Sequence, residues 1–429
     1  MTDPSALREE RIPVFCNDVP IGELWQIHHV GRTEYGFQYL KSVPEDQVVS
    51  LTMPVTSGDT PADYRGFAQV PHPFQVSLPE GWVVQHLAEQ FGKGLRLSDP
   101  FSLLKLVGRG LIRRITVGGA RQEVPLATPL RAAMHDSPSA TWIEQVLVQS
   151  RASQFGLSGV MPKIQITLPP NRQPGTPWLS HQILKLESPG YLGVCLAEDL
   201  ALQSARHYGL NTVQAHLNAA GDILSVERFD RKPDGRFLGF EDACALTGFP
   251  SALKYEGCLE KLFMMVEQFV SEAHVVEDKQ RLLKLCVLND VLRNGDAHQK
   301  NFGLLYDSLE EVRLAPVYDV LDTSLFLPDD IPALTVTQYF PDEAPRHKRW
   351  LTPNGIDALV EVADMVGVHG PHLVQEAIEA VADASRAYGD RLQEAGVCDA
   401  QRVAWAQTML GKTDARLRAL APPATARPR

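Results

Sequence analysis

The chain has 429 residues, which is enough for two or three domains because a typical domain has about 150. Apolar residues make up 44% and charged residues 22%, which excludes a mostly disordered chain, a collagen-like repeat and a small disulfide scaffold. The net charge of −11 argues against a general nucleic-acid coat, because such a protein binds by neutralising phosphates.

Two short segments are nevertheless basic. Four arginines and no acid lie within residues 109–121, and five basic residues and one acid lie between Lys412 and the end of the chain. Solvated surface segments are the simplest interpretation, and contact with a partner or an anion is the alternative. The four arginines are Arg109, Arg113, Arg114 and Arg121.

The six cysteines and the hydropathy of the chain indicate its compartment. No two cysteines form a C-x-x-C pair, and all six lie among apolar neighbours, which is typical of reduced, mostly buried thiols. The first residues have no apolar stretch of the secretory type, and no run of 18 apolar residues occurs. We therefore expect a cytoplasmic protein without a membrane span.

In chain order, the first elements are short. Residues 12–24 predict a hairpin around Asn17 and Asp18, and residues 47–55 predict a strand. Helices are expected at 78–92 and after Asp99, which is a suitable N-cap followed by Pro100 at the first helical position. Residues 122–142 are rich in Pro, Ala and Ser, as in a linker.

The middle of the chain changes character at about residue 143. Strands are predicted at 163–168, 181–187, 213–219 and 222–229, with a helix over 197–209 that ends at Gly209. From about 256 the pattern is helical, with helices at 259–269, 281–292 and 374–388 and a hairpin over 302–320. The last residues should be disordered.

The stretch N-G-D-A-H-Q-K-N, residues 294–301, carries the most chemical information. Asp296 and Asn301 are five residues apart, and Asp319 ends the next predicted strand. Phosphoryl transfer needs such a set, with one carboxylate to accept the proton of the attacking hydroxyl. An amide oxygen and a second carboxylate suit Mg²⁺. The spacing matches the kinase pattern H-R-D-x-x-x-x-N, and a polar turn after a helix is the alternative.

A kinase also needs a phosphate loop upstream. Residues 155–163 contain Gly156, Ser158, Gly159 and Lys163 just before a predicted strand. Small residues let the backbone approach a phosphate, and a lysine adds a point charge. The segment matches neither common glycine-rich fingerprint, so alone it is equally typical of a turn.

A second lysine, Lys185, lies among apolar residues of the next predicted strand. Such a lysine either faces solvent or is held by an anion. Glu198 lies in the following helix and could pair with Lys185, as the strand lysine of a kinase pairs with a helix glutamate. The order of these elements along the chain is the order found in kinases.

Six segments together resemble the HipA family of bacterial serine/threonine kinases, which are toxins of type II toxin–antitoxin pairs. These segments are S-G-V-M-P-K (158–163), I-L-K-L-E (183–187), V-E-R-F-D-R (226–231), L-K-Y-E-G (253–257), N-G-D-A-H-Q-K-N-F (294–302) and L-A-P-V-Y-D-V (314–320). N-D-V-P-I-G-E-L and D-P-F-S-L-L-K-L-V-G-R resemble the N-terminal subdomain of the family. Without the family, residues 227–231 would be interpreted as a surface ion-pair cluster.

The resemblance implies a role for each matching residue. Asp296 would be the catalytic base, with His298 and Lys300 beside it in the catalytic loop. Asn301 and Asp319 would hold Mg²⁺. ATP would be bound by the phosphate-loop residues Gly156, Ser158 and Gly159, by Lys163 and Lys185, and by the hinge residues Glu227 and Phe229.

The resemblance also implies the architecture and the biological role. We expect an α+β, bilobal kinase-like fold, with an N-terminal β-rich subdomain (1–125), a mixed α/β lobe (143–255), an all-α lobe (256–415) and a disordered tail (416–429). The activity would be that of a non-specific serine/threonine protein kinase whose target is a translation component such as an aminoacyl-tRNA synthetase. The partner would be a helix-turn-helix, HipB-like antitoxin, through which operator DNA is contacted.

Three departures from the family pattern concern regulation and substrate choice. The phosphate loop often reads S-x-S-G, with autophosphorylation on a serine, but here it reads Gly156-Leu157-Ser158-Gly159. Ser158 is the remaining candidate, and Ser153 is a neighbour without motif support. The N-terminal subdomain reads G-R-G-L-I-R-R at 108–114 where G-R-D-C-x-G is usual, and a long loop follows Asp319.

Two alternatives remain open at this point. Aminoglycoside and choline kinases carry a similar H-G-D-x-H-x-x-N loop, so a small-molecule phosphotransferase is possible, and an acidic pocket beside Asp296 would favour it. A catalytically silent kinase fold within a repressor complex is the second alternative, and the intact Asp296, Asn301 and Asp319 argue against it.

Overall fold

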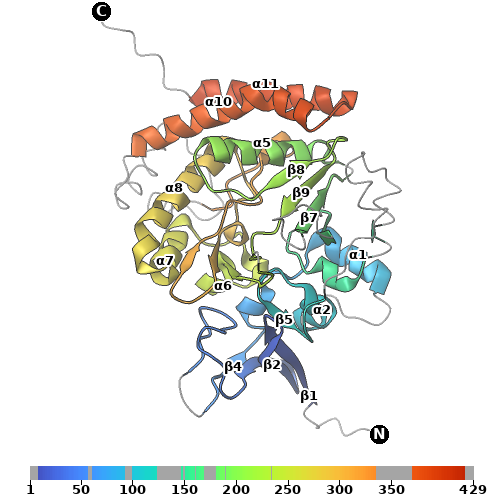
Figure 1. The fold of residues 1–429 in the computed structure, drawn as a ribbon, viewed down its shortest axis with the longest axis vertical. Coiled ribbons are helices and arrows are strands. Elements are labelled where there is room, and N and C mark those ends of the chain that lie inside the picture. Colours follow the sequence, from blue (N-terminus) through green and yellow to red (C-terminus); the bar gives the residue numbers. More distant parts are fainter. Residues whose placement is uncertain are drawn as a thin grey trace, which may run out of the picture.

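The computed structural model describes residues 8–56, 60–91, 99–122, 146–147, 150–159, 161–168, 180–188, 190–232, 234–334 and 370–420. Figure 1 shows a twisted sheet at the N-terminal end of the molecule and two long helices, α10 and α11, at the opposite end. The strands and helices between them enclose the site described below. The expected linker at 122–142 lies almost entirely outside the described residues.

The N-terminal sheet has five antiparallel strands in the order β4-β3-β2-β1-β5. The predicted hairpin is confirmed, because β1 and β2 are joined at Asn17 and Asp18, whose φ angles are 44° and 66°. Two residues with positive φ give the turn that matches the twist of antiparallel strands. The strands are β1 (Arg8–Cys16), β2 (Val19–His29), β3 (Arg32–Tyr39), β4 (Asp63–Phe67) and β5 (Ile115–Val117).

Helices α1 (Gly81–Phe91) and α2 (Pro100–Val107) follow this sheet. Asp99 caps α2 as predicted, because its carboxylate accepts hydrogen bonds from the backbone of Phe101 and Ser102. The strand predicted at 47–55 is wrong. That segment forms turns with a single bridge between Ser50 and Met53, and three of its apolar residues, Val48, Val49 and Met53, are buried against neighbouring elements.

The second sheet, in the order β6-β7-β9-β8, confirms the four strands predicted for the middle of the chain. Every neighbouring pair is antiparallel. Helix α5 (Val194–His207) joins β7 to β8, and Gly209 follows it with a φ of 75°. The strands are β6 (Lys163–Leu168), β7 (Ser180–Leu186), β8 (Ala215–Leu217) and β9 (Ile223–Glu227).

The remaining described chain is mostly helical and contains one small sheet. The predicted hairpin is present as β11 and β12, and β10 pairs with β11, so this lobe is not all-α. Helix α11 continues to Leu420, past the start of the tail expected to be disordered. The elements are β10 (Gly239–Asp242), β11 (Gly303–Tyr306), β12 (Val312–Leu314), α6 (Ala243–Thr247), α7 (Leu259–Phe269), α8 (Val275–Leu292), α10 (Gly370–Glu394) and α11 (Ala400–Leu420).

The second sheet is shared between two hydrophobic cores. Ile164, Ile166 and Leu184 pack with the core of the N-terminal sheet, whereas Leu224 and Val226 pack with α5 and the helical lobe. Each face of a strand presents alternate side chains, so one sheet can serve both cores. The N-terminal subdomain is therefore packed onto the sheet that carries the phosphate-loop lysine.

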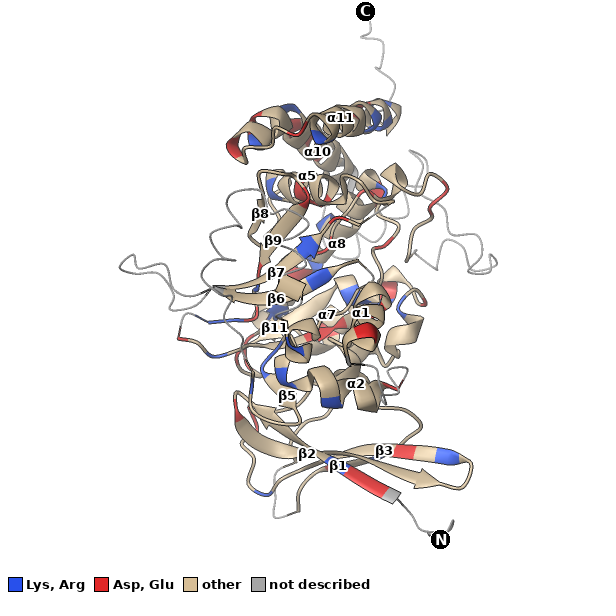
Figure 2. Cartoon of the chain, turned by 90° about the vertical axis from the view of Figure 1, so that its right-hand side faces the viewer, with Lys and Arg blue, Asp and Glu red and all other residues tan. Residues whose placement is uncertain are grey.

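The middle of the first basic segment is part of this packing, whereas Arg109 is exposed as expected. Arg113 and Arg114 are 1% and 4% exposed. The Arg114 guanidinium donates to the backbone oxygens of Val48 and Asp307 and lies 4.8 Å from the ring centre of Tyr306. Basic and acidic residues are interspersed along the elements (Figure 2). The segment thus joins the N-terminal subdomain to the third sheet.

The cysteines agree with the sequence-based expectation. None of the six forms a disulfide, and four of them, Cys16, Cys195, Cys244 and Cys286, are buried. Among the described residues, no helix combines the length and apolar character that crossing a membrane requires.

Candidate active site

A cleft lies between the second sheet and the third sheet, which is formed by β10, β11 and β12. Ten predicted site residues line it: Ser158, Gly159, Lys163, Lys185, Glu227, Phe229, His298, Lys300, Asn301 and Asp319. Tertiary structure thus brings together segments that are up to about 160 residues apart in the chain.

Lys185 is the centre of the charge network in the cleft. Its Nζ lies 2.5 Å from Glu198 Oε1 and 2.5 Å from Asp319 Oδ1, so the predicted pair with Glu198 is present and Asp319 joins it. Although burial alone would lower the pKa of Lys185, the two carboxylates raise it above its ordinary value. Lys185 is therefore a permanent cation in the cleft.

Lys163 lies beside Lys185, because the two residues are paired across β6 and β7. It is 6% exposed, and burial, assisted by repulsion from Lys185, lowers its pKa. A Cβ on Gly159 would come within 2.3 Å of Lys163 Nζ, and Gly159 has a φ of 108°. Only glycine gives the phosphate loop this shape without displacing the lysine.

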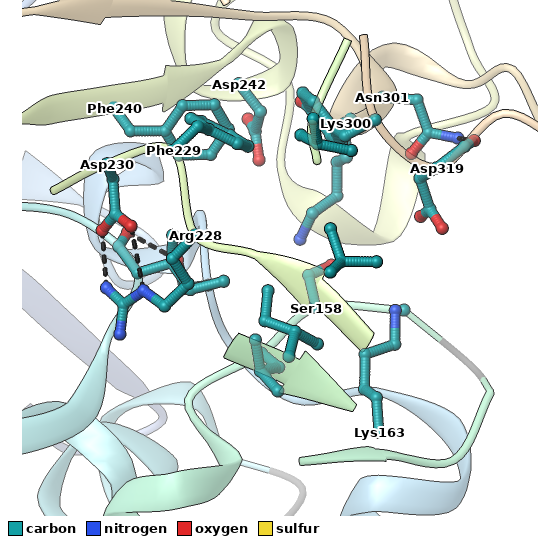
Figure 3. A pocket seen from close by; sticks show the side chains of 18 of the residues that line it. Ser158, Lys163, Arg228, Phe229, Asp230, Phe240, Asp242, Lys300, Asn301 and Asp319 are labelled. Atoms are coloured by element: carbon teal, nitrogen blue, oxygen red, sulfur yellow. Dashed lines mark hydrogen bonds and ion pairs between the residues drawn. The ribbon is translucent and has the colours of Figure 1, made fainter. Parts of the chain in front are cut away.

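Asp319 and Asn301 lie side by side at one end of the cleft (Figure 3). Asn301 Nδ2 donates to the backbone oxygens of Asp296 and Asp319, at 2.7 and 3.4 Å, which fixes the amide. Burial would raise the pKa of Asp319, but Lys185 and Lys163 lower it far below its ordinary value. The carboxylate is therefore ionised and able to bind a cation.

The other predicted residues of the 294–301 loop have specific partners. Asp296 lies outside the cleft wall with its side chain 40% exposed, and its Oδ1 accepts a hydrogen bond of 2.6 Å from Tyr255. Burial raises the pKa of Asp296, and the Tyr255 hydrogen bond opposes this. His298 is buried 3.9 Å from the same oxygen, and burial together with Lys254 lowers its pKa to about 3. His298 is therefore neutral.

Glu80, just before α1, was not identified from sequence. Its carboxylate accepts hydrogen bonds from Lys254 at 2.8 Å, Lys300 at 3.1 Å and Ser158 at 3.1 Å. Burial would raise the pKa of Glu80, but the two lysines lower it to about 2. The N-terminal subdomain therefore supplies the counterion that holds the 294–301 loop and the phosphate loop in place. Lys300 also donates to Ser251 Oγ at 2.5 Å.

The hinge segment 227–231 is mainly internal, which corrects the interpretation of it as a surface cluster. Arg228 and Asp230 form a bidentate ion pair whose side chains are 4% and 0% exposed. Arg228 also donates to Gln165 Oε1 at 2.6 Å. The Phe229 ring stacks on Tyr318 with the ring centres 5.4 Å apart, whereas Glu227 is exposed at the cleft edge.

Three apolar or small residues of the N-terminal subdomain also line the cleft, and sequence reasoning missed them. They are Val76, Ser77 and Ile112, and Val76 and Ile112 belong to the same apolar cluster as the hinge residue Phe229. No local pattern marks them, because their role depends on how the subdomain docks. Gly156, in contrast, lies outside the cleft wall. A Cβ on Gly156 would meet the Gly110 carbonyl oxygen at 2.7 Å.

The oxygen ligands at this end of the cleft are of the kind that binds a small hard cation together with phosphates. Among the described residues, no group of three or more His, Cys, Asp or Glu side chains could hold a metal alone. Mg²⁺ ordinarily takes only one or two protein oxygens and completes its shell with water and phosphate oxygens. Asn301 and Asp319, with Lys163 and Lys185 nearby, have this character.

The fold and the cleft between two lobes define a protein of the kinase-like, bilobal class with an added N-terminal subdomain. Two family descriptions match the chain, the HipA N-terminal domain over residues 12–117 and the HipA-like C-terminal domain over residues 155–417. The chain therefore belongs to the HipA family.

Individual relatives agree with this assignment. The chain is 28% identical to "Putative kinase Y4dM" of Sinorhizobium fredii over 324 residues, which are 68% of this chain and 72% of the relative. It is also 28% identical to "Putative kinase Y4mE" of the same organism over 344 residues, which are 74% of this chain and 78% of that relative. A chain from the Shewanella oneidensis complex of HipA, HipB and operator DNA has the same fold, with a TM-score of 0.59 at 17% identity, over 95% of this chain and 96% of that one.

Proposed function

We propose that this protein is an ATP- and Mg²⁺-dependent serine/threonine protein kinase and the toxin of a toxin–antitoxin pair. The observation that supports the proposal most strongly is that Lys185, in the cleft, forms ion pairs with both Glu198 and Asp319. A lysine held between a helix glutamate and a metal-binding aspartate is the arrangement that kinases use to bind nucleotide phosphates. The family membership supports the same activity.

Each residue of the cleft then has a task. Lys163, Lys185 and the phosphate-loop residues Ser158 and Gly159 would bind the phosphates of ATP. Asn301 and Asp319 would hold Mg²⁺, which neutralises the charge that develops on the phosphoryl group. The adenine would lie in the apolar part of the cleft, next to Phe229 and Glu227.

Asp296 would act as the general base for a serine or threonine hydroxyl. It is ionised above its raised pKa, and the neutral His298 beside it adds no competing positive charge. Lys300 would balance charge on the transferring phosphoryl group once released from Glu80. The acceptor would be a translation component such as an aminoacyl-tRNA synthetase, as the family implies.

The partner would be a HipB-like antitoxin with a helix-turn-helix fold, and operator DNA would be contacted mainly through it. The Shewanella oneidensis relative was solved with HipB and operator DNA. The net charge of −11 of the present chain supports an indirect contact with DNA, because direct binding would bring like charges together.

The decisive experiment incubates the purified protein with labelled ATP, Mg²⁺ and a cell lysate, in parallel with Asp296→Asn. We expect a labelled protein band whose intensity the variant reduces by about 10²-fold or more, because a general base contributes a factor of 10²–10⁴. Asp234→Asn, at an exposed ion pair with Arg236, is the matched control and should label normally. Labelling that is equal in Asp296→Asn and wild type would exclude the proposal.

The lining of the cleft bears on the small-molecule alternative. It contains four basic side chains (Lys163, Lys185, Arg228 and Lys300) and four acidic ones (Glu227, Asp230, Asp242 and Asp319). A cationic acceptor such as an aminoglycoside would favour a cleft with an excess of acids. Label found only in small molecules of the lysate would nevertheless establish that activity instead.

A further inference from the structure

The segment L-K-Y-E-G lies within residues 251–257, which we call the strap. The strap is hydrogen-bonded to the 294–301 loop. The backbone N–H of Gln299 donates to the Lys254 oxygen at 3.1 Å, and Gln299 Nε2 donates to the Glu256 oxygen at 2.5 Å. Lys300 Nζ donates to Ser251 Oγ at 2.5 Å. These hydrogen bonds fix the position of the strap relative to Asp296. The catalytic roles proposed above include no residue of the strap.

Tyr255 projects from the strap to Asp296. Its hydroxyl donates a hydrogen bond of 2.6 Å to Asp296 Oδ1, and its ring packs edge-on against His298 with the ring centres 5.0 Å apart. The residue is 41% exposed, so it reaches the carboxylate from the solvent side. Lys254 Nζ also lies 5.2 Å from the centre of the ring. The hydrogen bond and the ring contacts are each worth about 0.5–1.5 kcal/mol, so a bound acceptor can replace the hydrogen bond at modest cost.

The contact between Tyr255 and Asp296 has the geometry that a general base needs with its substrate. A hydroxyl that will lose its proton must donate to the base over about 2.6–3.2 Å. The Tyr255 hydroxyl does so already at Oδ1. An acceptor hydroxyl that donates to Oδ1 along the same direction would need the place that the Tyr255 hydroxyl now holds.

We propose that Tyr255 occupies the acceptor-hydroxyl position, that a serine or threonine side chain of the acceptor displaces it, and that the 251–257 strap is one wall of the acceptor subsite. This inference rests on the proposed function. In the reaction, the acceptor oxygen forms a bond to the γ-phosphorus of ATP while the bond from that phosphorus to the bridging oxygen breaks, and ADP takes the electron pair. The acceptor proton passes to Asp296, and Tyr255 is left unchanged.

The test compares wild type with Tyr255→Phe, using dephosphorylated casein as acceptor with ATP and Mg²⁺, and ADP release without casein, where water is the acceptor. We expect the KM for casein to fall roughly three- to tenfold, the range that exchange of one hydrogen bond gives. ADP release should rise, and the KM for ATP should stay unchanged. Tyr64→Phe, at an exposed hydroxyl that donates to the Pro54 oxygen, is the matched control.

Each other result has a defined meaning. A kcat that falls in Tyr255→Phe, or a KM and ADP release that equal those of wild type, would overturn the inference while leaving the proposed function intact. Phosphotyrosine at position 255 would also overturn it, because Tyr255 would then be an acceptor itself. Wild-type protein that neither labels casein nor releases ADP would contradict the proposed function, and this inference would fall with it.

Discussion

Gly156 of the phosphate loop lies directly against Gly110 of the N-terminal subdomain. A Cβ on Gly156 would lie 2.7 Å from the Gly110 oxygen, and a Cβ on Gly110 would lie 1.7 Å from the backbone oxygen of Ser153. Gln165 Nε2 donates to the carbonyl oxygens of both glycines, at 2.6 and 3.1 Å. Two of the positions where this chain departs from the family pattern are therefore in contact, and a side chain at either one would collide with backbone atoms.

This contact predicts the effect of restoring the serine of the S-x-S-G pattern. We expect Gly156→Ser to lower the free energy of unfolding by about 1–3 kcal/mol, because the new side chain meets backbone that cannot move aside. Urea denaturation measures the change. Gly389→Ser is the matched control, since a Cβ there has open space, and it should change stability by less than about 0.5 kcal/mol. Equal effects in the two variants would contradict this account.

Lys185 should be essential for phosphoryl transfer. Its replacement in Lys185→Met removes a charged donor and leaves Glu198 and Asp319 without their shared cation, so we expect kcat/KM to fall by about 10²–10³-fold. Initial rates of labelling measure the loss. Lys279→Met, at an ion pair with the exposed Glu267, should retain full activity. A Lys185→Met protein that is folded and fully active would refute the assignment.

Ser158 should be the site of self-phosphorylation. Its hydroxyl lines the cleft and donates to Glu80, whereas Ser153 is 4% exposed and lies beneath Gly110. We expect Ser158→Ala to lose self-labelling with ATP and Mg²⁺ and Ser153→Ala to keep it. Mass spectrometry of the wild-type protein locates the phosphate, and its detection on Ser153 would reverse the assignment.

Glu80 should make stability depend on pH in the acidic range. Its pKa of about 2 in the folded protein is below its unfolded value near 4.5, so its stabilising effect is present above pH 4.5 and is lost as pH falls toward 2. We expect Glu80→Gln to be less stable than wild type by roughly 3 kcal/mol at pH 7, with the difference nearly absent at pH 2. Denaturation curves at several pH values measure this, and a difference independent of pH would contradict it.

Local sequence patterns predicted most of the secondary structure correctly. The four strands of the second sheet, helices α5, α7 and α8, and the Asp99 cap follow from periodicity and capping chemistry, which act over a few residues. The strand predicted at 47–55 is wrong because its apolar residues are buried without strand pairing. Leu51 instead donates its backbone N–H to the buried Glu241 at 2.8 Å.

The sequence alone predicted the order of the chemical groups along the chain, from the phosphate loop through Lys185 and Asp296 to Asp319. It also predicted the family that this order indicates. Only the tertiary structure decided what surrounds those groups. Glu80, Ile112, Gly110 and Tyr255 act across 40 to 220 residues of chain, and the buried Arg113 and Arg114 were expected at the surface. The reason is physical: local patterns report which face of an element is apolar, whereas the partner of a buried charge is chosen by how the elements dock.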